Sequence, residues 1–240
     1  MTSRGRIKSL QVGLPCTLEC KDVGISSGQT WTTGFFKHSI GDPVWLGRLN
    51  LDGDGQADLD NHGGLDKAVN VYPIEHYSYW MQDLSLTELV PGAFGENFTT
   101  EALSENEVCI GDIFEIGESL VEVSQPRQPC WKLARRWGVQ DLALRFQNTG
   151  RTGWYFRVLR EGLVQANQTV RLVSRPYPHW TIVAANLLMH HQTADLEAAR
   201  ALASCPALSS RWQAKLNKRA ESGMVESSAT RLYGPRADRT

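Results

Sequence analysis

Short strands broken by turn residues fill about the first three quarters of the chain and constrain its fold more than any other feature. Gly117-Glu118 and Glu161-Gly162 suit the tight turns between such strands. Strands of this length and spacing favour a closed or nearly closed β-barrel over alternating β-α units. The candidate strands are residues 6–12, 44–50, 68–72, 108–110, 113–116, 120–124, 154–159 and 170–174.

Helical segments interrupt this pattern and then replace it. Within the strand-rich part, helices are predicted over residues 74–83, 131–137 and 140–146. After residue 176 the strand signal ends, and Asp195 and Ser209 are good N-caps for two of three further helices. These three helices are predicted over residues 181–191, 195–204 and 209–221.

We therefore expect three parts and a mainly β (α+β) fold. Residues 1–175 form the barrel with peripheral helices, and residues 176–222 form a C-terminal three-helix domain. Three short helices bury little surface alone, so they pack together or dock on the barrel. Residues 223–240 form a polar tail that we expect to be partly disordered.

Composition narrows the class of protein. The 240 residues carry a net charge of −1, and this nearly neutral balance does not indicate a protein that binds nucleic acid. No apolar run is long enough for a bilayer, and the N-terminus has no signal-peptide pattern, so we expect a cytoplasmic protein without a membrane partner. The five cysteines are odd in number and irregular in spacing, which argues against a disulfide framework. Cys16 and Cys20 lack a second pair, which argues against structural zinc.

The best candidate for a reactive group lies in the segment 124–133, Ser-Gln-Pro-Arg-Gln-Pro-Cys-Trp-Lys-Leu. Pro126 and Pro129 cannot donate to a sheet ladder, so the preceding strand ends there. Cys130 then falls at or just before a helix N-terminus, where the helix dipole and nearby cations lower a thiol pKa and favour the thiolate. The alternative is a buried cysteine that acts as a small hydrophobe. The nearby cations are Arg127, Lys132, Arg135 and Arg136.

The segment 51–64 is rich in aspartate and ends in His62-Gly63-Gly64. An EF-hand loop counted from Asp52 would need glutamate at its twelfth position, where Gly63 stands, so only a looser calcium site or an aspartate turn remains. The two glycines allow close approach of the backbone to a ligand. His62 is either a structural histidine or the partner of Cys130 in a nucleophile pair.

Three other segments offer polar groups for a ligand. Residues 91–100 place Glu96 and Asn97 in a loop that either lines a pocket or caps turns. Residues 148–155 form a glycine-rich turn whose Arg151 suits an anion, without a nucleotide-binding motif. Residues 31–38 set hydroxyls next to Lys37, a weak anion signal that also fits an ordinary strand. Serine-hydrolase and zinc-protease motifs are absent from the sequence.

Four of these motifs together resemble the MOSC-domain proteins, named for the C-terminal domain of molybdenum cofactor sulfurases, and most closely their bacterial YiiM-type members. They are Gly-Asp-Gly-Gln-Ala-Asp from Gly53, His62-Gly63-Gly64, Gly95-Glu96-Asn97 and the 125–130 turn. The downstream Asn-Thr-Gly-x-x-Gly-Trp from Asn148 also matches. The resemblance runs from about residue 6 to residue 222.

The resemblance implies a barrel-like fold with a three-helix appendage and a molybdenum cofactor (molybdopterin) whose metal takes the thiolate of Cys130. It further implies reduction of N-hydroxylated compounds such as hydroxylaminopurines, with His62 and Glu96 as candidates to relay a proton or orient the substrate. The residues expected to contact the cofactor are Thr33, Lys37, His62, Gly63, Gly64, Asn97, Arg127 and Arg151.

Three functions remain open at this point. A reductase of small N-hydroxylated substrates would need a separate flavoprotein or other electron donor, because the chain has no flavin, nicotinamide or iron–sulfur motif. A sulfur carrier or transferase would hold a persulfide on Cys130. A non-catalytic module would only bind a small anion. Basic residues of the last helix form either a face for an acidic redox partner or a solvated surface, and they are Arg211, Lys215, Lys218 and Arg219.

Overall fold

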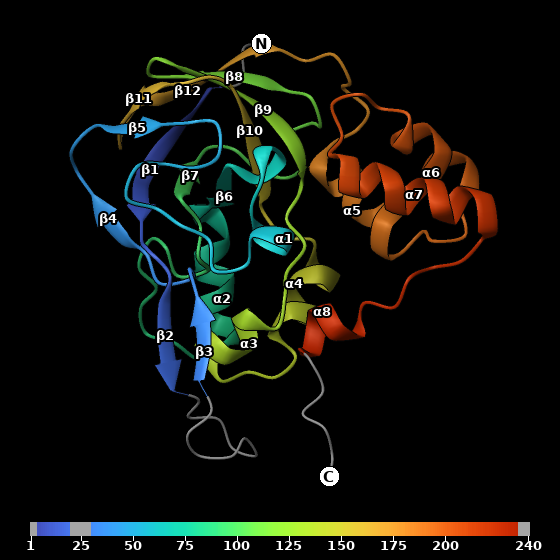
Figure 1. Ribbon diagram of the computed structural model, residues 1–240, viewed down its shortest axis with the longest axis horizontal. Coiled ribbons are helices and arrows are strands. Elements are labelled where there is room, and N and C mark those ends of the chain that lie inside the picture. The colour runs from blue at the N-terminus through green and yellow to red at the C-terminus, as the bar shows by residue number, and fades with distance from the viewer. Residues whose placement is uncertain (1–3, 20–29, 235–240) are drawn as a thin grey trace.

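The computed structural model describes residues 4–19 and 30–234, and its centre is a seven-stranded barrel (Figure 1). Each strand pairs with the next around the ring, and the β1–β12 pair closes it. All neighbours are antiparallel except β6 and β7. In ring order the strands are β12 (Thr169–Ser174), β8 (Ile113–Ile116), β9 (Ser119–Pro126), β10 (Trp154–Arg160), β6 (Val69–Pro73), β7 (Phe98–Glu101) and β1 (Arg4–Val12).

Short strands outside the ring complete the β structure. β4 pairs with β1, while β5 pairs with β11 and β2 with β3 as two small ribbons. The mainly β barrel is confirmed, but the predicted strand 108–110 is wrong. That segment is buried and makes only a bridge from Cys109 to Thr181. The additional strands are β2 (Cys16–Glu19), β3 (Thr30–Thr33), β4 (His38–Ile40), β5 (Val44–Leu46) and β11 (Gly162–Val164).

Two apolar clusters stabilise the barrel domain. Alternate strand residues fill the barrel interior, where Phe114 and Phe156 lie 5.8 Å apart between ring centroids. A second cluster lies under the helices at one end, where the Trp80 and Phe146 rings stack at 4.0 Å. Complete burial of such a ring contributes about 2–3 kcal/mol. The helices are α2 (Tyr77–Asp83), α3 (Lys132–Trp137) and α4 (Leu142–Thr149), and two short 3₁₀ turns, η1 (Leu65–Lys67) and η2 (Ile74–His76), precede α2.

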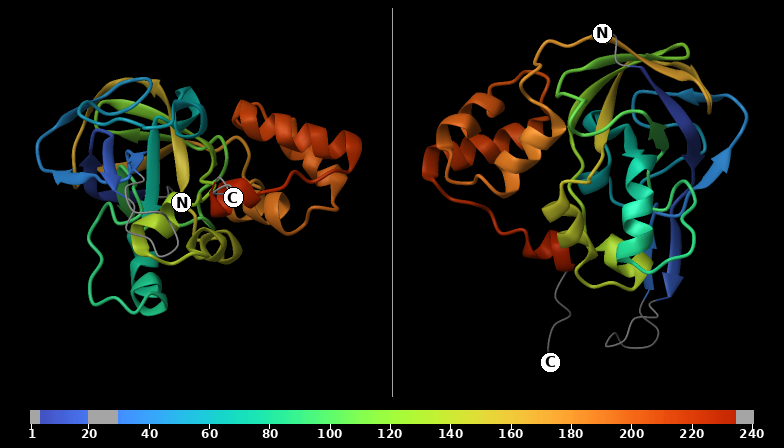
Figure 2. Two further views of the ribbon diagram at one scale, coloured as in Figure 1. Left: turned by 60° about the horizontal axis from the view of Figure 1, so that its bottom comes forward. Right: turned by 180° about the vertical axis from the view of Figure 1, so that it is seen from behind.

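The C-terminal helices α5 (Ile182–His190), α6 (Leu196–Ala203) and α7 (Ser210–Ser222) form a separate layer beside the barrel (Figure 2). Their apolar faces join the barrel core through residues such as Trp212. Asp195 and Ser209 cap α6 and α7 as predicted, because each side chain accepts a hydrogen bond from a first-turn N–H.

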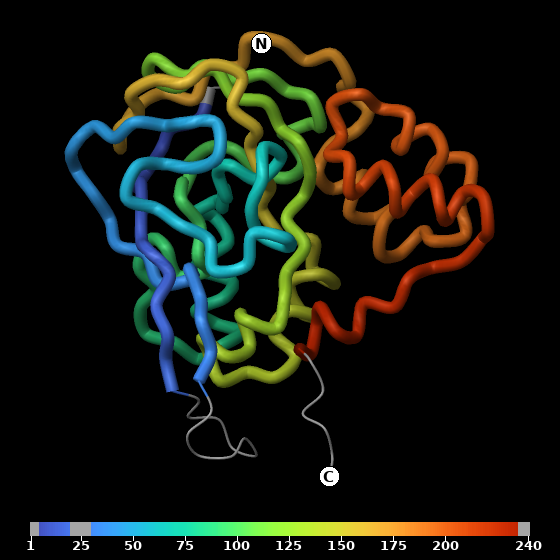
Figure 3. The backbone as a smooth tube through the Cα atoms, in the orientation of Figure 1, coloured from blue at the N-terminus to red at the C-terminus, as the bar shows by residue number. Residues whose placement is uncertain are grey.

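The chain after α7 returns to the barrel and ends in α8 (Ala229–Tyr233) (Figure 3). Leu232 is buried, and Gly234 adopts φ +86 against the Trp131 indole, where a Cβ would come within 3.2 Å. The structure describes residues 223–234 of the predicted polar tail, and within them residues 229–233 form the helix α8. Within residues 4–19 and 30–234, every helix falls short of the length and apolar character that a bilayer span needs.

A buried histidine makes the stability of the fold depend on pH. Burial lowers the pKa of His190 from 6.5 to about 3, and nearby Arg231 acts in the same direction. Between these values the unfolded chain binds a proton that the folded chain excludes, so stability falls as the pH decreases from 6.5. The unchanged protein should lose stability when the pH is lowered from about 7 to about 5, and we expect this loss to be smaller by about 1–2 kcal/mol in the variant His190→Gln. Urea unfolding at each pH measures the free energy of unfolding, and the variant His191→Gln, at an exposed position, is the control. If the pH dependence of stability in His190→Gln equals that of the unchanged protein, the prediction is wrong.

Candidate functional site

Cys130 lies in a turn between the end of β9 and the start of α3. The Arg127 N–H donates to the Gly153 carbonyl at 3.0 Å, which holds the entrance of the turn. Trp131 is the N-cap of α3, and the Leu133 N–H donates to the Cys130 carbonyl at 3.0 Å. The Lys132 backbone N–H hydrogen bonds to the Cys130 sulfur. The predicted position of Cys130, just before a helix N-terminus, is confirmed.

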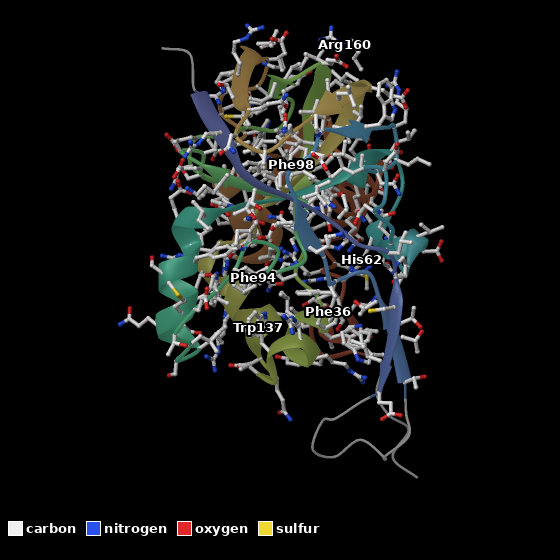
Figure 4. All side chains as sticks on the ribbon, turned by 90° about the vertical axis from the view of Figure 1, so that its left-hand side faces the viewer. Phe36, His62, Phe94, Phe98, Trp137 and Arg160 are labelled. Atoms are coloured by element: carbon white, nitrogen blue, oxygen red, sulfur yellow. The ribbon has the colours of Figure 1, made fainter. Side chains whose placement is uncertain are left out.

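The Cys130 side chain faces a pocket with an empty volume of about 640 Å³. The pocket lies beside the barrel core, at the level of His62 and Phe94 and below Phe98 in the view of Figure 4. The end of β3, the 55–57 loop, the Phe94–Asn97 loop and the Cys130 turn form its walls. Six residues predicted to form the site line it, and they are Thr33, Lys37, His62, Asn97, Arg127 and Cys130.

His62 contacts Cys130 directly. It is the last residue of α1 (Leu59–His62), which Asp58 caps, and its Nε2 lies 3.4 Å from the Cys130 sulfur. Burial lowers the pKa of His62 to about 4, and the Lys132 ammonium also lowers it, so the imidazole is neutral at pH 7. Its Nδ1 lies 3.5 Å from an Asp58 oxygen without a hydrogen bond. The Cys130–His62 pair left open by the sequence is therefore present.

The sequence predicted a thiolate at Cys130, but the protein residues around it do not by themselves favour that form. Burial raises the pKa of the Cys130 thiol, and this effect exceeds the opposing ones of the Lys132 N–H and the cations Arg127, Lys132 and Arg231. A soft metal cation at the sulfur would displace the proton, because metal coordination deprotonates a thiol outright.

Lys37 belongs to a buried network rather than to a free cationic wall. Its ammonium pairs with Asp54, whose Oδ1 also accepts from the Gly13 N–H at 3.0 Å. Asp54 Oδ2 accepts from Asn97 Nδ2 at 2.9 Å. Burial lowers the pKa of Lys37, while Asp54 raises it. The carboxylate of Asp54 thus neutralises Lys37, and this network accounts for one aspartate of the sequence that suggested calcium.

Polar atoms without partners lie in the pocket walls. Arg127 donates through Nη2 to the Phe94 carbonyl at 2.7 Å, but its buried Nη1 has no hydrogen-bond partner in the described part of the chain. The same holds for Asn70 Oδ1. Asn70 stands in the otherwise apolar β6, a signal that sequence reasoning missed. Lys132, one of the cations expected beside Cys130, also lines the pocket. Lys67 and Tyr155 line it too, and their sequence context gave no comparable signal.

Glu96 lies outside the pocket walls and is completely buried. Its carboxylate accepts hydrogen bonds from the Tyr77 hydroxyl, from Thr99 Oγ1 at 2.9 Å and from two backbone N–H groups of the 92–94 turn at 2.8 and 3.0 Å. A carboxylate with four donors is a structural centre for its loop. The position therefore contradicts the expected contact of Glu96 with substrate.

Arg151 and the two glycines after His62 also lie outside the pocket walls. The Arg151 guanidinium stacks over the Tyr79 ring at 4.0 Å, which turns it away from the predicted anion site. The Gly63 N–H donates to the Leu59 carbonyl at 3.2 Å, so it is not available for a ligand. Gly64 adopts φ +91, a conformation that favours glycine, between α1 and the turn that carries Lys67. These three expected cofactor contacts are not found.

Comparison with known proteins places these features in a family. Residues 58–171 match the model of the MOSC domain, and residues 180–223 match the model of the YiiM-like, 3-alpha helix domain. Protein YiiM of Escherichia coli (strain K12) is 40% identical over 82% of this chain and 89% of its own length. The chain belongs to the MOSC-domain family and is of the YiiM type.

Other relatives extend the comparison. The uncharacterized protein YflK of Bacillus subtilis (strain 168) is 46% identical over 90% of this chain and 95% of its own length. A protein of Gibberella moniliformis named reductase is 35% identical over 74% of this chain but only 31% of its own length. The crystal structure of YiiM from Geobacillus stearothermophilus superposes with a TM-score of 0.75 at 36% identity, over 90% of this chain and 99% of its own. The crystal structure of YiiM from Escherichia coli superposes with a TM-score of 0.76 at 38% identity, over 84% of this chain and 96% of its own.

The residues of this MOSC pocket fit a molybdenum cofactor of the pterin type. Cys130 offers one soft sulfur ligand, suited to a transition metal that takes its other sulfurs from a dithiolene. Arg127, Lys67 and Lys132 offer cationic groups for a phosphate. The unpaired Arg127 Nη1 and Asn70 Oδ1 are a donor and an acceptor of the kind that a pterin edge requires.

The buried carboxylate of Glu96 predicts a stability effect rather than a purely catalytic one. We expect Glu96→Ala to lower the free energy of unfolding by about 2–4 kcal/mol, because it leaves four buried donors unpaired. The control is Glu101→Ala on β7, which removes an exposed pair with Arg6 and costs less than about 1 kcal/mol. Urea unfolding measures both, and equal stabilities for the two variants would refute the structural role.

Proposed function

We propose that this protein is a molybdenum-cofactor-dependent reductase of N-hydroxylated compounds such as hydroxylaminopurines, with Cys130 as the thiolate ligand of the metal. The overall reaction takes R–NHOH, two electrons and two protons to R–NH₂ and water. The N–O bond breaks, the substrate nitrogen is reduced, and the electron donor is oxidised. The membership of the MOSC family and the relative named reductase support an oxidoreductase in general terms.

The observation that carries the proposal is the surroundings of the Cys130 sulfur. The half-buried sulfur faces an open pocket that also contains three cationic side chains without a carboxylate partner in the described part of the chain, Lys67, Arg127 and Lys132. A buried cysteine of purely structural function would be enclosed by apolar side chains instead.

Each wall of the pocket has a distinct part in holding the cofactor. Arg127 and Lys132 flank Cys130 in sequence and would hold the cofactor phosphate together with Lys67. Asn70 and Thr33 would contact the pterin, since Thr33 Oγ1 accepts from the Phe35 N–H at 3.1 Å and keeps its own hydrogen free to donate. Lys37 and Asn97 would act indirectly, because their polar groups are engaged with Asp54.

When bound, the cofactor would supply the two-electron chemistry of oxygen removal, while the protein supplies position and protons. We assign proton handling to His62, on the basis of its position 3.4 Å from the Cys130 sulfur. Its Nε2 faces the sulfur and is the atom at which a proton would be exchanged. The electrons would come from a separate flavoprotein or other reductase.

The Cys130–His62 contact favours a second candidate, a sulfur carrier or transferase with a persulfide on Cys130. In that case a donor persulfide, R–S–SH, would transfer its outer sulfur to Cys130. The thiol would lose its proton to His62, the thiolate would attack the outer sulfur, the donor S–S bond would break, and the leaving R–S⁻ would take up a proton and depart as R–SH. A non-catalytic module that binds a small anion would use the same cationic walls without metal or persulfide.

Metal content separates the three candidates. We expect the protein from cells that make the molybdenum cofactor to contain molybdenum in about a one-to-one ratio, and Cys130→Ser to lose most of it because an alcohol is a poor soft-metal ligand. Elemental analysis and pterin fluorescence provide the measurement. Cys16→Ser, in β2 and outside the pocket, is the matched control. Persulfide on Cys130 without molybdenum would favour the sulfur carrier. Absence of both molybdenum and persulfide would favour the non-catalytic binding module.

Replacement of His62 separates proton handling from cofactor retention. We expect His62→Ala to reduce turnover of a hydroxylaminopurine about 10²-fold or more with an unchanged molybdenum content, because general acid–base groups contribute about that much. Steady-state assays with a supplied flavoprotein reductase and elemental analysis provide the two measurements. Loss of the metal together with activity would instead make His62 a cofactor anchor.

A further inference from the structure

A second cavity lies on the other side of Cys130, between the barrel, α7 and the C-terminal segment 223–234. Its empty volume is about 1080 Å³, including space that is open to solvent. Gln125, Cys130 and Trp131 approach it from the barrel side, while Arg211 and Lys215 approach it from α7 and Arg231 from α8. Five residues line both cavities, and they are His62, Lys67, Gln128, Cys130 and Tyr155.

The walls of this second cavity carry an excess of positive charge. Four of the lining residues are cationic, Lys67, Arg211, Lys215 and Arg231, and Asp58 is the carboxylate among them. Asp58 is engaged with Asn61, whose N–H and side-chain amide both donate to it at 3.0 Å. The charge of the cavity wall is therefore not balanced locally.

The contacts of these cations are with neutral oxygens. Lys67 donates to the Asn61 carbonyl at 2.6 Å, and Arg211 donates to Asn61 Oδ1 at 3.0 Å. Arg231 donates to the Pro129 carbonyl and to Gln147 Oε1 at 2.6 Å. We find no hydrogen bond or ion pair for the Lys215 ammonium in the described part of the chain, and nearby Glu226 pairs with Lys218 at 2.9 Å.

The proximity of these cations affects their pKa values. The pKa of Lys67 is lowered to about 8, first by burial and then by the positive charges of Arg211 and Lys215. The negative charges of Asp66 and Asp58 raise this pKa by a smaller amount. Burial also lowers the pKa of Lys215, with a contribution from Arg231. Folding against this repulsion is costly, and an anion in the cavity would remove that cost.

Two buried polar atoms in the same walls have no partner in the described residues. Gln125 is 2% exposed and its Oε1 is unpaired, while Trp212 is 1% exposed and its Nε1 is unpaired. Both residues line the second cavity. They are an acceptor and a donor, and Tyr155 and Trp131 supply aromatic surface beside them. This is the chemistry of a site for a flat heterocycle that has both N–H and ring-nitrogen groups.

We propose that the second cavity binds the substrate as a phosphorylated nucleoside, with its phosphate at Arg211 and Lys215 of α7 and its base toward Gln125, Tyr155 and Cys130. The inference rests on the proposed function for the reaction at Cys130, but the binding step does not depend on it. It gives the three-helix domain a function, because α7 contributes Arg211 and Lys215 to the wall of the second cavity. A free base would lack these contacts and would bind less tightly.

The experiment compares a nucleotide with its base in the protein as purified from cells that make the cofactor. Adenosine 5′-monophosphate, adenosine and adenine are titrated calorimetrically, and the hydroxylamino derivatives of base and monophosphate are assayed as substrates. We expect the monophosphate to bind about tenfold or more tightly than adenosine, and the double variant Arg211→Gln, Lys215→Gln to abolish that difference. Adenine carries no phosphate, so its binding should not change in the double variant.

The matched control is Lys218→Gln, which removes one charge from the exposed face of the same helix. It should leave the preference for the monophosphate unchanged. Equal affinities for monophosphate and nucleoside, or a preference that survives the double variant, would overturn the proposal. If the hydroxylamino compounds are not reduced while the phosphate-dependent binding persists, the proposed reaction fails and the cavity assignment stands. If the free base is reduced but phosphate brings no advantage, the reaction stands and the cavity assignment fails.

Discussion

The backbone hydrogen bonds that hold the Cys130 turn are the constraint on which the site depends. Pro126 and Pro129 deprive the turn of two donors, so it cannot continue the β9 ladder. The Arg127 N–H bonds to Gly153 on one side, and the Trp131 N–H bonds to the Arg231 carbonyl at 2.8 Å on the other. The turn is thus held between the barrel and the C-terminal helix α8, and Cys130 lines both the first pocket and the second cavity.

Burial and charge compensation decide which cations of the site are available to an anion. Lys37 lies in the first pocket, but Asp54 neutralises it at short range. Arg127 and Lys67 are bonded to neutral carbonyl oxygens, which fix their positions without cancelling their charge. Such cations raise the affinity of a cavity for anions more than surface lysines do, because the surrounding dielectric is lower.

The three-helix domain completes the site rather than merely extending the barrel. Its helix α7 packs Trp212 into the common core and brings Arg211 and Lys215 to the second cavity. The following segment then brings Arg231 back to the Cys130 turn. The basic residues of this helix were expected to face a redox partner or solvent. Arg211 and Lys218 are exposed, as expected for a solvated surface, although Arg211 also lines the cavity with the partly buried Lys215. Arg219 is instead buried and donates to the carbonyls of Leu188 and Met189 at 2.9 Å.

The sequence by itself determined the elements that depend on local chemistry. Alternating apolar residues and glycine turns predicted the barrel, Asp195 and Ser209 predicted helix starts, and the two prolines predicted the Cys130 turn. A pair of His62 and Cys130 was one of two alternatives that the sequence left open, and the structure contains it, since the Nε2 and the sulfur lie 3.4 Å apart. The strand β2 was missed, and a strand at β3 was only one alternative for residues 31–38, because the pairing of these polar strands depends on contacts with each other rather than on a local apolar pattern.

Only the tertiary structure decided which polar residues face a cavity and which charges survive burial. Glu96 and Arg151 stand in motifs as distinctive as that of His62. However, the Glu96 carboxylate accepts hydrogen bonds from four donors, and the Arg151 guanidinium stacks on the Tyr79 ring. The thiol of Cys130 has its pKa raised because desolvation depends on atoms from β10, α1 and α8 that are remote in sequence. Burial and Coulomb interactions are properties of distances in space, and a linear pattern of residue types does not contain them.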